Sequence, residues 1–271
     1  MTSDIRIAAH PYGYVRAVED RNLYQAADRI FADLAEAGYD GIELMHTMLE
    51  AEEAVDRLEA LSTEHDLPII GTSFGGQMWD PDQTEEIAAQ TERIAGQIQA
   101  LGGHHLGIST GSTGKPKTQE QLDTQAALIR RMIEICKPRG ITVDMHNHTY
   151  EVDWDLHELR GMIERMPELK LGPDLNWLRR AGVDPLQFLR TYADRIVFLH
   201  LRDQAGELWP QALGEGDEDW EAVAAVLDEI DFSGWAAVEL AHEREVELTR
   251  PMGENYRLSL QHLRRAFHRQ S

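Results

Sequence analysis

Acidic and histidine side chains stand at or just after the ends of short apolar runs in the chain. In the second half of the sequence they are Asp144, His146, His148, Glu151, Asp174, His200 and Glu239. A buried strand seldom carries an ionisable group unless that group is paired or bound to a metal. Carboxylates combined with imidazoles suit Mn²⁺, Mg²⁺, Co²⁺ or Zn²⁺ better than a metal that prefers thiolates. The pattern therefore predicts a site for one divalent metal ion, if the fold brings these run ends together.

Five further side chains in comparable places are predicted to contact a substrate. They are His10, Glu43, Trp79, Trp177 and Arg202. Trp79 and Trp177 fall in the stretches after the third and sixth runs, where an indole face covers a sugar ring or closes the mouth of a barrel by packing. For Arg202, binding of a substrate oxygen and an ion pair with the adjacent Asp203 are both open.

The elements that must position these residues are eight β-rich runs that alternate with helical stretches. The predicted strands are Ile5–His10, Gly41–Met45, Pro68–Ser73, His104–Ser109, Ile141–His146, Leu169–Asp174, Arg195–Leu201 and Trp235–Leu240. The predicted helices are Leu23–Ala37, Ala51–His65, Thr84–Leu101, Thr118–Lys137, Asp155–Met166, Pro185–Tyr192, Asp219–Ile230 and Asn255–His268.

This alternation over residues 1–271, with no linker, predicts an α/β fold, a single (β/α)8 TIM barrel. A doubly wound open sheet is the alternative, but no G-x-G-x-x-G follows the first strand. Catalytic groups of such barrels lie at the carboxyl ends of the strands. The predicted ligands should therefore meet at one mouth.

Composition narrows the class of partner. The chain has 48 acidic and 26 basic residues, a formal net charge of −22, and such a field repels nucleic acid. The apolar runs are too short to span a membrane. The single cysteine, Cys136, and the lack of an apolar signal segment at the start fit a cytoplasmic protein. An acidic surface with only four lysines resembles proteins of salt-loving organisms.

Six stretches carry a family resemblance: Met145–Glu151, Leu171–Trp177, Gly182–Pro185, Phe198–Asp203, Gly214–Asp217 and Ala237–Leu240. They resemble the sugar isomerase/epimerase superfamily with xylose isomerase-like barrels, which includes inosose dehydratases, ketose 3-epimerases and related lyases. In that family a strand-5 carboxylate, a strand-6 Asp, a strand-7 His and a strand-8 Glu hold one metal ion. The resemblance implies Asp174, His200 and Glu239 as the last three ligands.

The strand-5 ligand is where the chain departs from the family pattern. Many members have Glu-Asn-His where this chain has His146-Asn147-His148. A subgroup with His-Asn-His carries a glutamate a few residues later, and Glu151 matches it. The resemblance therefore favours Glu151 as the fourth ligand, with His146 as the alternative, which would release Glu151 for acid–base work. We expect His148 or His146 to be the general base, because the pKa of histidine lies near neutrality.

The implied reaction is metal-assisted removal of a proton next to the carbonyl of a sugar or polyol, with Mn²⁺ the expected ion. Isomerisation or epimerisation is the expected outcome. Trp177 stands where ketose epimerases usually have a histidine, so a dehydratase or lyase that eliminates a β-substituent from a keto-sugar or 3-keto-glycoside is the alternative. A hypothesis of another class is a non-catalytic subunit or sugar-binding barrel, since some members act in hetero-oligomers. A homo- or hetero-oligomer is possible under each hypothesis.

Overall fold

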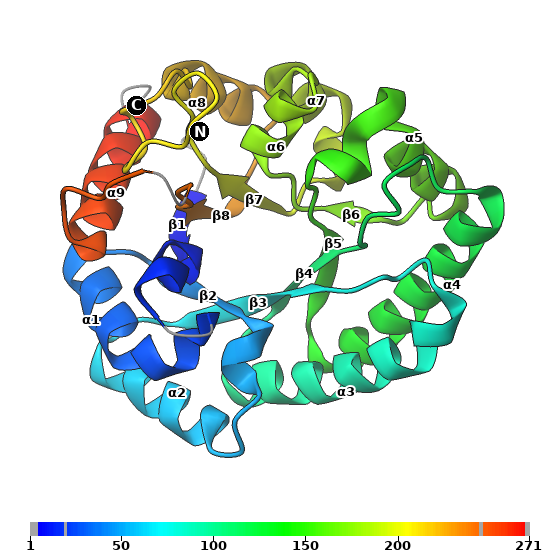
Figure 1. The fold of residues 1–271 in the computed structure, drawn as a ribbon, viewed down its shortest axis with the longest axis horizontal. Helices are drawn as coiled ribbons and strands as arrows, with labels where there is room; N and C mark the ends of the chain where they lie inside the picture. The colour runs from blue at the N-terminus through cyan, green and yellow to red at the C-terminus, as the bar shows by residue number, and fades with distance from the viewer. Residues whose placement is uncertain (1–4, 19–20, 244–245, 269–271) are drawn as a thin grey trace.

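The computed structural model describes residues 5–18, 21–243 and 246–268. Eight parallel strands stand inside a ring of helices (Figure 1), in the order β6-β5-β4-β3-β2-β1-β8-β7. The parallel bridges Leu171↔Ile196 and Asp174↔His200 connect the two edges of this sheet, so the barrel is nearly closed. The predicted (β/α)8 barrel is confirmed.

The strands are β1 (Ile5–His10), β2 (Gly41–Met45), β3 (Ile69–Gly75), β4 (His105–Ser109), β5 (Thr142–Met145), β6 (Lys170–Leu171), β7 (Phe198–Leu201) and β8 (Gly234–Glu239). The helices are α1 (Ala27–Ala37), α2 (Ala54–Glu64), α3 (Thr84–Ala100), α4 (Gln119–Cys136), α5 (Thr149–Arg165), α6 (Leu175–Arg180), α7 (Pro185–Thr191), α8 (Trp220–Glu229) and α9 (Met252–His268). Short 3-10 turns, such as Pro11–Ala17 after β1 and His46–Leu49 after β2, connect several of them.

Most predicted elements match the structure to within a few residues at each end, and the largest departures are at strand 6 and at the helix after strand 5. The sequence predicts that strand 6 reaches Asp174, but β6 ends at Leu171. Pro173 has no N–H for the strand ladder, and Asp174 instead begins α6, where its Oδ1 accepts hydrogen bonds from Asn176 N at 2.9 Å and Trp177 N at 3.0 Å. Such a capping carboxylate stabilises a helix start. The short helix α6 was not predicted.

Helix α5 begins at Thr149, six residues before the predicted start. Asp153 to Leu156 depart from helical backbone geometry, and the φ angles of Trp154, Asp155 and Leu156 are 51°, 57° and 59°. Left-handed backbone is unfavourable for residues with a side chain. The predicted helix Asp155–Met166 therefore corresponds mostly to the part of α5 after this break.

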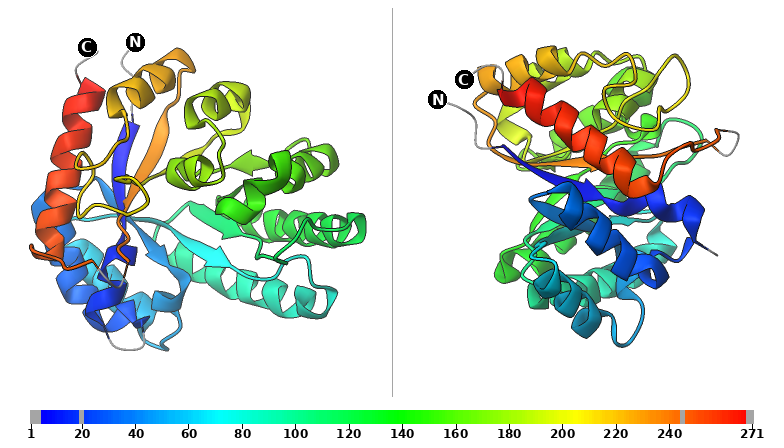
Figure 2. Two further views of the ribbon diagram at one scale, coloured as in Figure 1. Left: turned by 45° about the horizontal axis from the view of Figure 1, so that its top comes forward. Right: turned by 90° about the vertical axis from the view of Figure 1, so that its left-hand side faces the viewer.

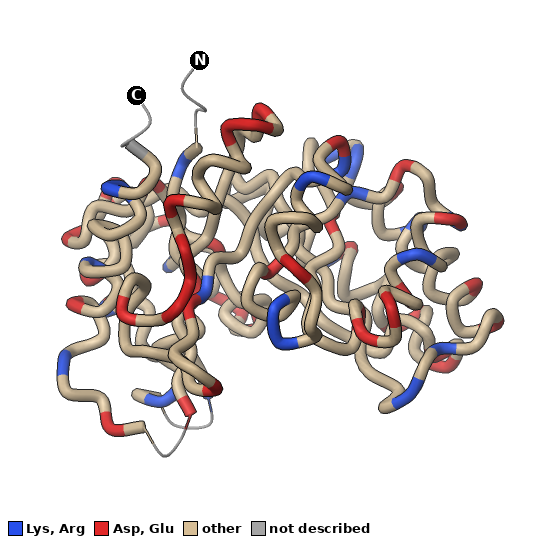
Figure 3. Tube along the Cα trace, turned by 90° about the horizontal axis from the view of Figure 1, so that it is seen from above, with Lys and Arg blue, Asp and Glu red and all other residues tan. Residues whose placement is uncertain are grey.

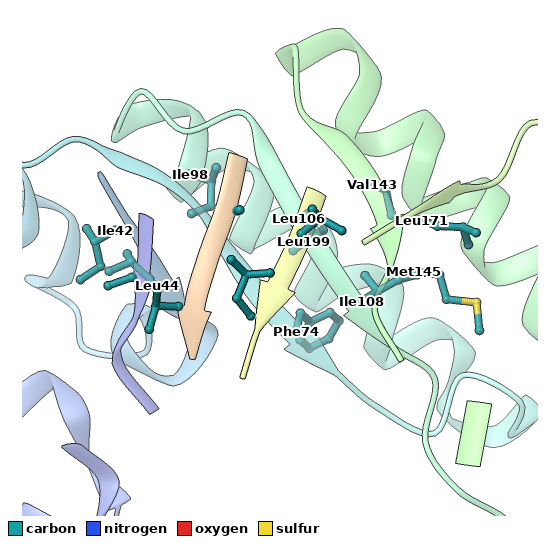
Figure 4. Packing of buried hydrophobic residues seen from close by; sticks show 14 of the residues in the cluster. Ile42, Leu44, Phe74, Ile98, Leu106, Ile108, Val143, Met145, Leu171 and Leu199 are labelled. Carbon is teal, nitrogen blue, oxygen red and sulfur yellow. The ribbon is translucent and has the colours of Figure 1, made fainter. Parts of the chain in front are cut away.

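Apolar strand residues pack outward against the helices, and polar residues alternate with them toward the barrel interior. Figure 4 shows part of the outer layer, which includes Ile42, Leu44, Leu106, Ile108, Val143 and Met145. Because successive strand residues point to opposite faces, the residues between these, such as Glu43 and Asp144, face inward. A smaller apolar cluster consists of Ala8, Ile70, Phe198, Trp235 and Ala237.

The two ends of the described chain lie at one end of the barrel. β1 begins and α9 ends there (Figure 2), while the carboxyl ends of the strands form the opposite mouth. Acidic residues are spread over the helices and loops among fewer basic ones (Figure 3). In the part of the chain that is described, no helix combines the length and the apolar character needed to cross a membrane.

Candidate active site

A cavity of about 180 Å³ opens at the carboxyl ends of the strands. Its wall consists of His10, Tyr12, Met45, His46, Ser73, Phe74, Gly75, Gly107, Ser109, His146, His148, His200 and Glu239. These residues come from, or closely follow, seven different strands, which places five histidines around one small space.

Three buried groups from this region meet as possible metal ligands. One donor atom each of His146, Asp174 and Glu239 lies within 4.8 Å of the others. Asp174 Oδ2 is buried and accepts no hydrogen bond. Arg202 supplies positive charge beside them, because its Nη2 lies 2.6 Å from Glu239 Oε1 and its Nε 3.4 Å from Asp174 Oδ2.

The charges of this cluster suit a divalent cation. Burial raises the pKa of Asp174, although Arg202 opposes the rise. Burial would also raise the pKa of Glu239, but Arg202 and His10 outweigh it and hold that pKa well below its usual value. Two carboxylates and an imidazole are donors that Mn²⁺, Mg²⁺ or Zn²⁺ accepts, and Asp174 Oδ2 still has its lone pairs free of hydrogen bonds. The residues present therefore fit the ion that the sequence predicts.

His200 adjoins the cluster, and Glu43 in the barrel interior holds its ring. Its Nε2 lies 2.7 Å from Glu43 Oε2, and its Nδ1 lies 3.0 Å from His146 Nδ1. Burial disfavours the imidazolium, but Glu43 overcomes this and raises the pKa of His200 to about 9. Burial and the positive charge of His200 hold the pKa of His146 well below its ordinary value.

Glu151 is buried but lies outside the three-residue cluster. Its Oε1 accepts hydrogen bonds from Ser109 Oγ at 2.9 Å and Thr110 N at 3.0 Å, and its Oε2 accepts one from His148 N at 2.7 Å. This arrangement is a capping box at the start of α5. Of the four predicted ligands, the structure thus brings Asp174 and Glu239 together with His146, places His200 beside them and directs Glu151 to the backbone.

His148 stands at the cavity wall with its Nδ1 facing Ser109. The two atoms are 2.8 Å apart. Because Ser109 Oγ donates its proton to the Glu151 carboxylate, the network assigns a proton to His148 Nδ1, which donates to Ser109. The other ring nitrogen, Nε2, is then the basic one. The ring stacks on Tyr150 with centroids 5.1 Å apart and lies 5.5 Å from Trp177.

The residues predicted to contact substrate occupy three kinds of place. His10 is in the cavity wall, with its Nε2 3.0 Å from Ser73 Oγ. Glu43 and Trp177 lie next to wall residues, beneath His200 and beside His148. Trp79 contributes nothing to the described wall.

Arg202 pairs with Asp174 and Glu239 rather than with Asp203. The Asp203 carboxylate instead accepts hydrogen bonds from the backbone N–H groups of Gly214, Gly216 and Glu218, and so organises the loop before α8.

Several polar residues of the site were not singled out from the sequence. Tyr12, Ser73 and Ser109 line the cavity, and His105 is buried below it. A signal was present in β4, where His105-Leu-Gly-Ile-Ser109 alternates polar or small residues with apolar ones. Such alternation indicates a strand with one polar face.

Comparison with known proteins defines the family. The model of the xylose isomerase-like TIM barrel family matches residues 31–266, and the chain belongs to this family. Curated relatives include an inosose dehydratase from Geobacillus kaustophilus, 27% identical over 44% of this chain and 45% of its own length. Another from Clostridium perfringens is 23% identical over 49% of this chain and 51% of its own. The chain thus spans about half the length of the curated relatives it matches.

Solved structures with the same fold cover nearly the whole chain. D-allulose 3-epimerase from Methylomonas sp. superposes with a TM-score of 0.80 at 18% identity, over 97% of this chain and 98% of its own. The 3-keto-D-glucoside 4-epimerase from E. coli superposes with a TM-score of 0.75 at 17% identity, over 97% and 100%. At these identities the likeness shows the fold.

Proposed function

We propose that the protein is a divalent-metal-dependent enzyme that removes a proton next to the carbonyl of a sugar or polyol, with isomerisation or epimerisation as the outcome. The observation that carries this proposal is the convergence of His146, Asp174 and Glu239 at a cavity that His148 borders. The relatives support it, since those named above are an epimerase of a ketose, an epimerase of a keto-glucoside and dehydratases of an inosose.

In this proposal His146, Asp174 and Glu239 hold the metal ion together with the adjoining His200. His146 is then the strand-5 ligand, the second of the two possibilities that the sequence leaves open. When bound, the ion would polarise the substrate carbonyl and stabilise the negative charge that follows deprotonation. Mn²⁺ is the ion we propose, because the donors are mainly oxygen with imidazole.

His148 takes the proton. Ser109 accepts from its Nδ1 at 2.8 Å and donates to Glu151, so Nε2 is left to act as the base. Histidine as a residue type suits this role near neutral pH. Glu151 acts through Ser109 as a positioning residue, in the way a carboxylate orients the base of a catalytic triad.

The cavity wall sets the size and polarity of the substrate. About 180 Å³ is less than the roughly 300–1,000 Å³ of pockets for drug-sized ligands, so a single sugar ring is the appropriate size. His10, Tyr12 and Ser73 offer hydrogen bonds to hydroxyl groups, while Met45 and Phe74 supply apolar surface.

Elimination is the second candidate reaction. Among the described residues of the cavity wall, Glu239 is the one carboxylate, and it is paired with Arg202. Epimerisation by two carboxylates needs a free carboxylate on each face of the substrate, and the described wall of this cavity does not offer them. Elimination of a β-substituent needs one imidazole base, which His148 supplies. The inosose dehydratase relatives also favour elimination.

The experiment uses ketoses, inososes and 3-keto-glycosides in D₂O with purified protein and Mn²⁺, followed by NMR. Exchange of a carbon-bound proton next to the carbonyl reports proton removal whichever product forms. We expect exchange in at least one class, abolished by a chelator and restored by Mn²⁺. Formation of an unsaturated product would select elimination. Sugar binding without exchange in any class would overturn the enzyme proposal in favour of a binding barrel.

A further inference from the structure

Below the cavity, three titratable side chains form a buried line through the barrel interior. Asp144 Oδ1 lies 2.8 Å from His105 Nδ1, and His105 Nε2 lies 3.3 Å from Glu43 Oε1. Each of the three is at most 4% exposed. Glu43 Oε2 continues the line to His200 Nε2 at 2.7 Å. We call Asp144, His105, Glu43 and His200 the interior chain.

The surrounding backbone makes room for this chain. A Cβ atom at Gly172 would lie 2.0 Å from Asp144 Oδ2, and one at Gly71 would lie 2.6 Å from His105 Cβ. The His105 ring also stacks on Phe198, with centroids 3.8 Å apart and planes within 9°. Glycine at two positions and an aromatic partner thus fix the place of both groups.

The surroundings of His105 favour its cationic form. It is the group that lies between two fully buried carboxylates, one on β5 and one on β2. Burial disfavours the imidazolium, but Asp144 and Glu43 outweigh it and raise the pKa of His105 to about 10. Barrel interiors are usually filled by Val, Ile and Leu, and a buried ion pair is often no more stable than apolar packing. A gain in stability alone therefore does not explain why Asp144, His105 and Glu43 occupy the barrel interior.

We propose that His105 and Asp144 are positioning residues for His200. His105, held between Asp144 and Glu43, fixes the Glu43 carboxylate in the place where it accepts the hydrogen bond of His200 Nε2. The His200 ring is thereby fixed with Nδ1 toward His146 and the metal cluster. This inference rests on the proposed function in one respect, that the cluster holds a metal ion.

Loss of His105 would disturb the chain in a defined way. Glu43 Oε1 would lose its partner at 3.3 Å, and the buried carboxylates of Asp144 and Glu43 would no longer have a ring between them. The Glu43 carboxylate would then be free to turn, and the 2.7 Å contact that holds His200 Nε2 would loosen.

The test is His105→Phe, which keeps the ring stacked on Phe198 but removes both nitrogens. His104→Phe is the matched control, because the adjacent His104 is exposed and contacts Trp235 Nε1. Mn²⁺ affinity is measured by calorimetry. We expect His105→Phe to bind Mn²⁺ about 10–100-fold more weakly than the parent, the usual effect of losing a partner that orients a ligand, and His104→Phe to match the parent. A folded His105→Phe protein with parental affinity would overturn the proposal.

NMR of ¹⁵N-histidine-labelled parent protein without metal gives a readout that needs no variant to fold. We expect both ring nitrogens of His105 to carry protons at pH 8. An unprotonated nitrogen on His105 would overturn the proposal. If the parent binds no metal, the proposed function fails, whereas the ring protonation in the parent still decides whether the interior chain is built as inferred.

Discussion

The histidines of this molecule differ mainly in what holds their second nitrogen. Glu43 holds Nε2 of His200, and Ser109 holds Nδ1 of His148. In each case the partner decides which ring nitrogen faces the mouth. Histidine is therefore placed beside the metal site at position 200 and as a base at position 148. His105 has carboxylates at both nitrogens, which leaves it no free nitrogen for substrate.

The strand-5 ligand is decided by a pair of substitutions. We expect His146→Asn to weaken Mn²⁺ binding by at least about 10-fold, because it removes a donor from the cluster. Glu151→Gln should bind Mn²⁺ within about 2-fold of the parent, because its side chain bonds to backbone and Ser109, but should lose turnover. Calorimetry with Mn²⁺ and the D₂O exchange rate measure both effects. Release of metal by Glu151→Gln, with normal binding by His146→Asn, would restore Glu151 as the ligand.

Ser109→Ala tests how His148 is oriented. The variant removes the hydroxyl that accepts from His148 Nδ1 and donates to Glu151. We expect kcat to fall by about 10–100-fold, less than the roughly 100–10,000-fold that a general base itself contributes, while KM changes little. Ser109→Thr keeps a hydroxyl and should retain most of the rate. Equal losses in the two variants would point to a packing effect and contradict the assignment.

At the scale of elements, the loop between β4 and α4 is joined to α5 by a buried ion pair. Lys117 Nζ donates to Glu158 Oε1 at 2.8 Å, to Gln125 Oε1 at 2.8 Å and to Thr110 Oγ1 at 3.0 Å. Thr110 in turn donates its backbone N–H to Glu151. The pair thus supports the carboxylate that orients Ser109 and His148.

Lys117→Met should destabilise the protein by about 3–5 kcal/mol, because it leaves Glu158 as a buried charge without its cation. Lys115→Met is the control, since Lys115 lies two residues away and is exposed, and surface changes usually stay within about 0.5 kcal/mol. Urea unfolding followed by circular dichroism measures both. Similar unfolding midpoints for the two variants would show that the ion pair contributes little.

The hydrophobic pattern of the strands predicts the bounds of several elements well, whereas elements that depend on local turns are not predicted. β1 and β2 have the predicted bounds, because each is a continuous apolar or alternating run with a clear end. The early end of β6 and the helix α6 depend on Pro173 and on the carboxylate of Asp174 turning back to cap a six-residue helix. The sequence marks Asp174 as a ligand at a strand end, but the short helix that it also caps has too few residues to show a helical pattern.

At the scale of the whole molecule, the mouth was predictable and the interior was not. In a barrel the strand ends must meet, so Asp174 and Glu239 could be expected at one site from their places in the sequence. The pairing of His105 with Glu43 joins residues 62 positions apart. It depends on the register of neighbouring strands, which decides the side chain that each glycine faces, and a single sequence does not specify that register.

The interior chain also predicts how the stability of the whole protein depends on pH. The pKa of His105 is raised from 6.5 to about 10 in the folded state, so the folded protein keeps a proton that the unfolded chain loses. Its contribution is complete below about pH 6.5 and is lost as pH rises toward about 10. One such proton changes the free energy of unfolding by up to about 1.4 kcal/mol per pH unit.

We therefore expect the parent to lose stability between pH 7 and pH 10 more steeply than His105→Gln, as measured by urea unfolding at several pH values. His104→Gln should follow the parent, because partial burial of the His104 ring lowers its pKa and leaves it neutral in both states over this range. Asp144 and Glu43 are the charged groups that face His105, so Asp144→Asn should flatten the dependence in part. Parallel curves for the parent and His105→Gln would mean that His105 is neutral in the folded protein, and that Glu43 is held ionised by His200 alone.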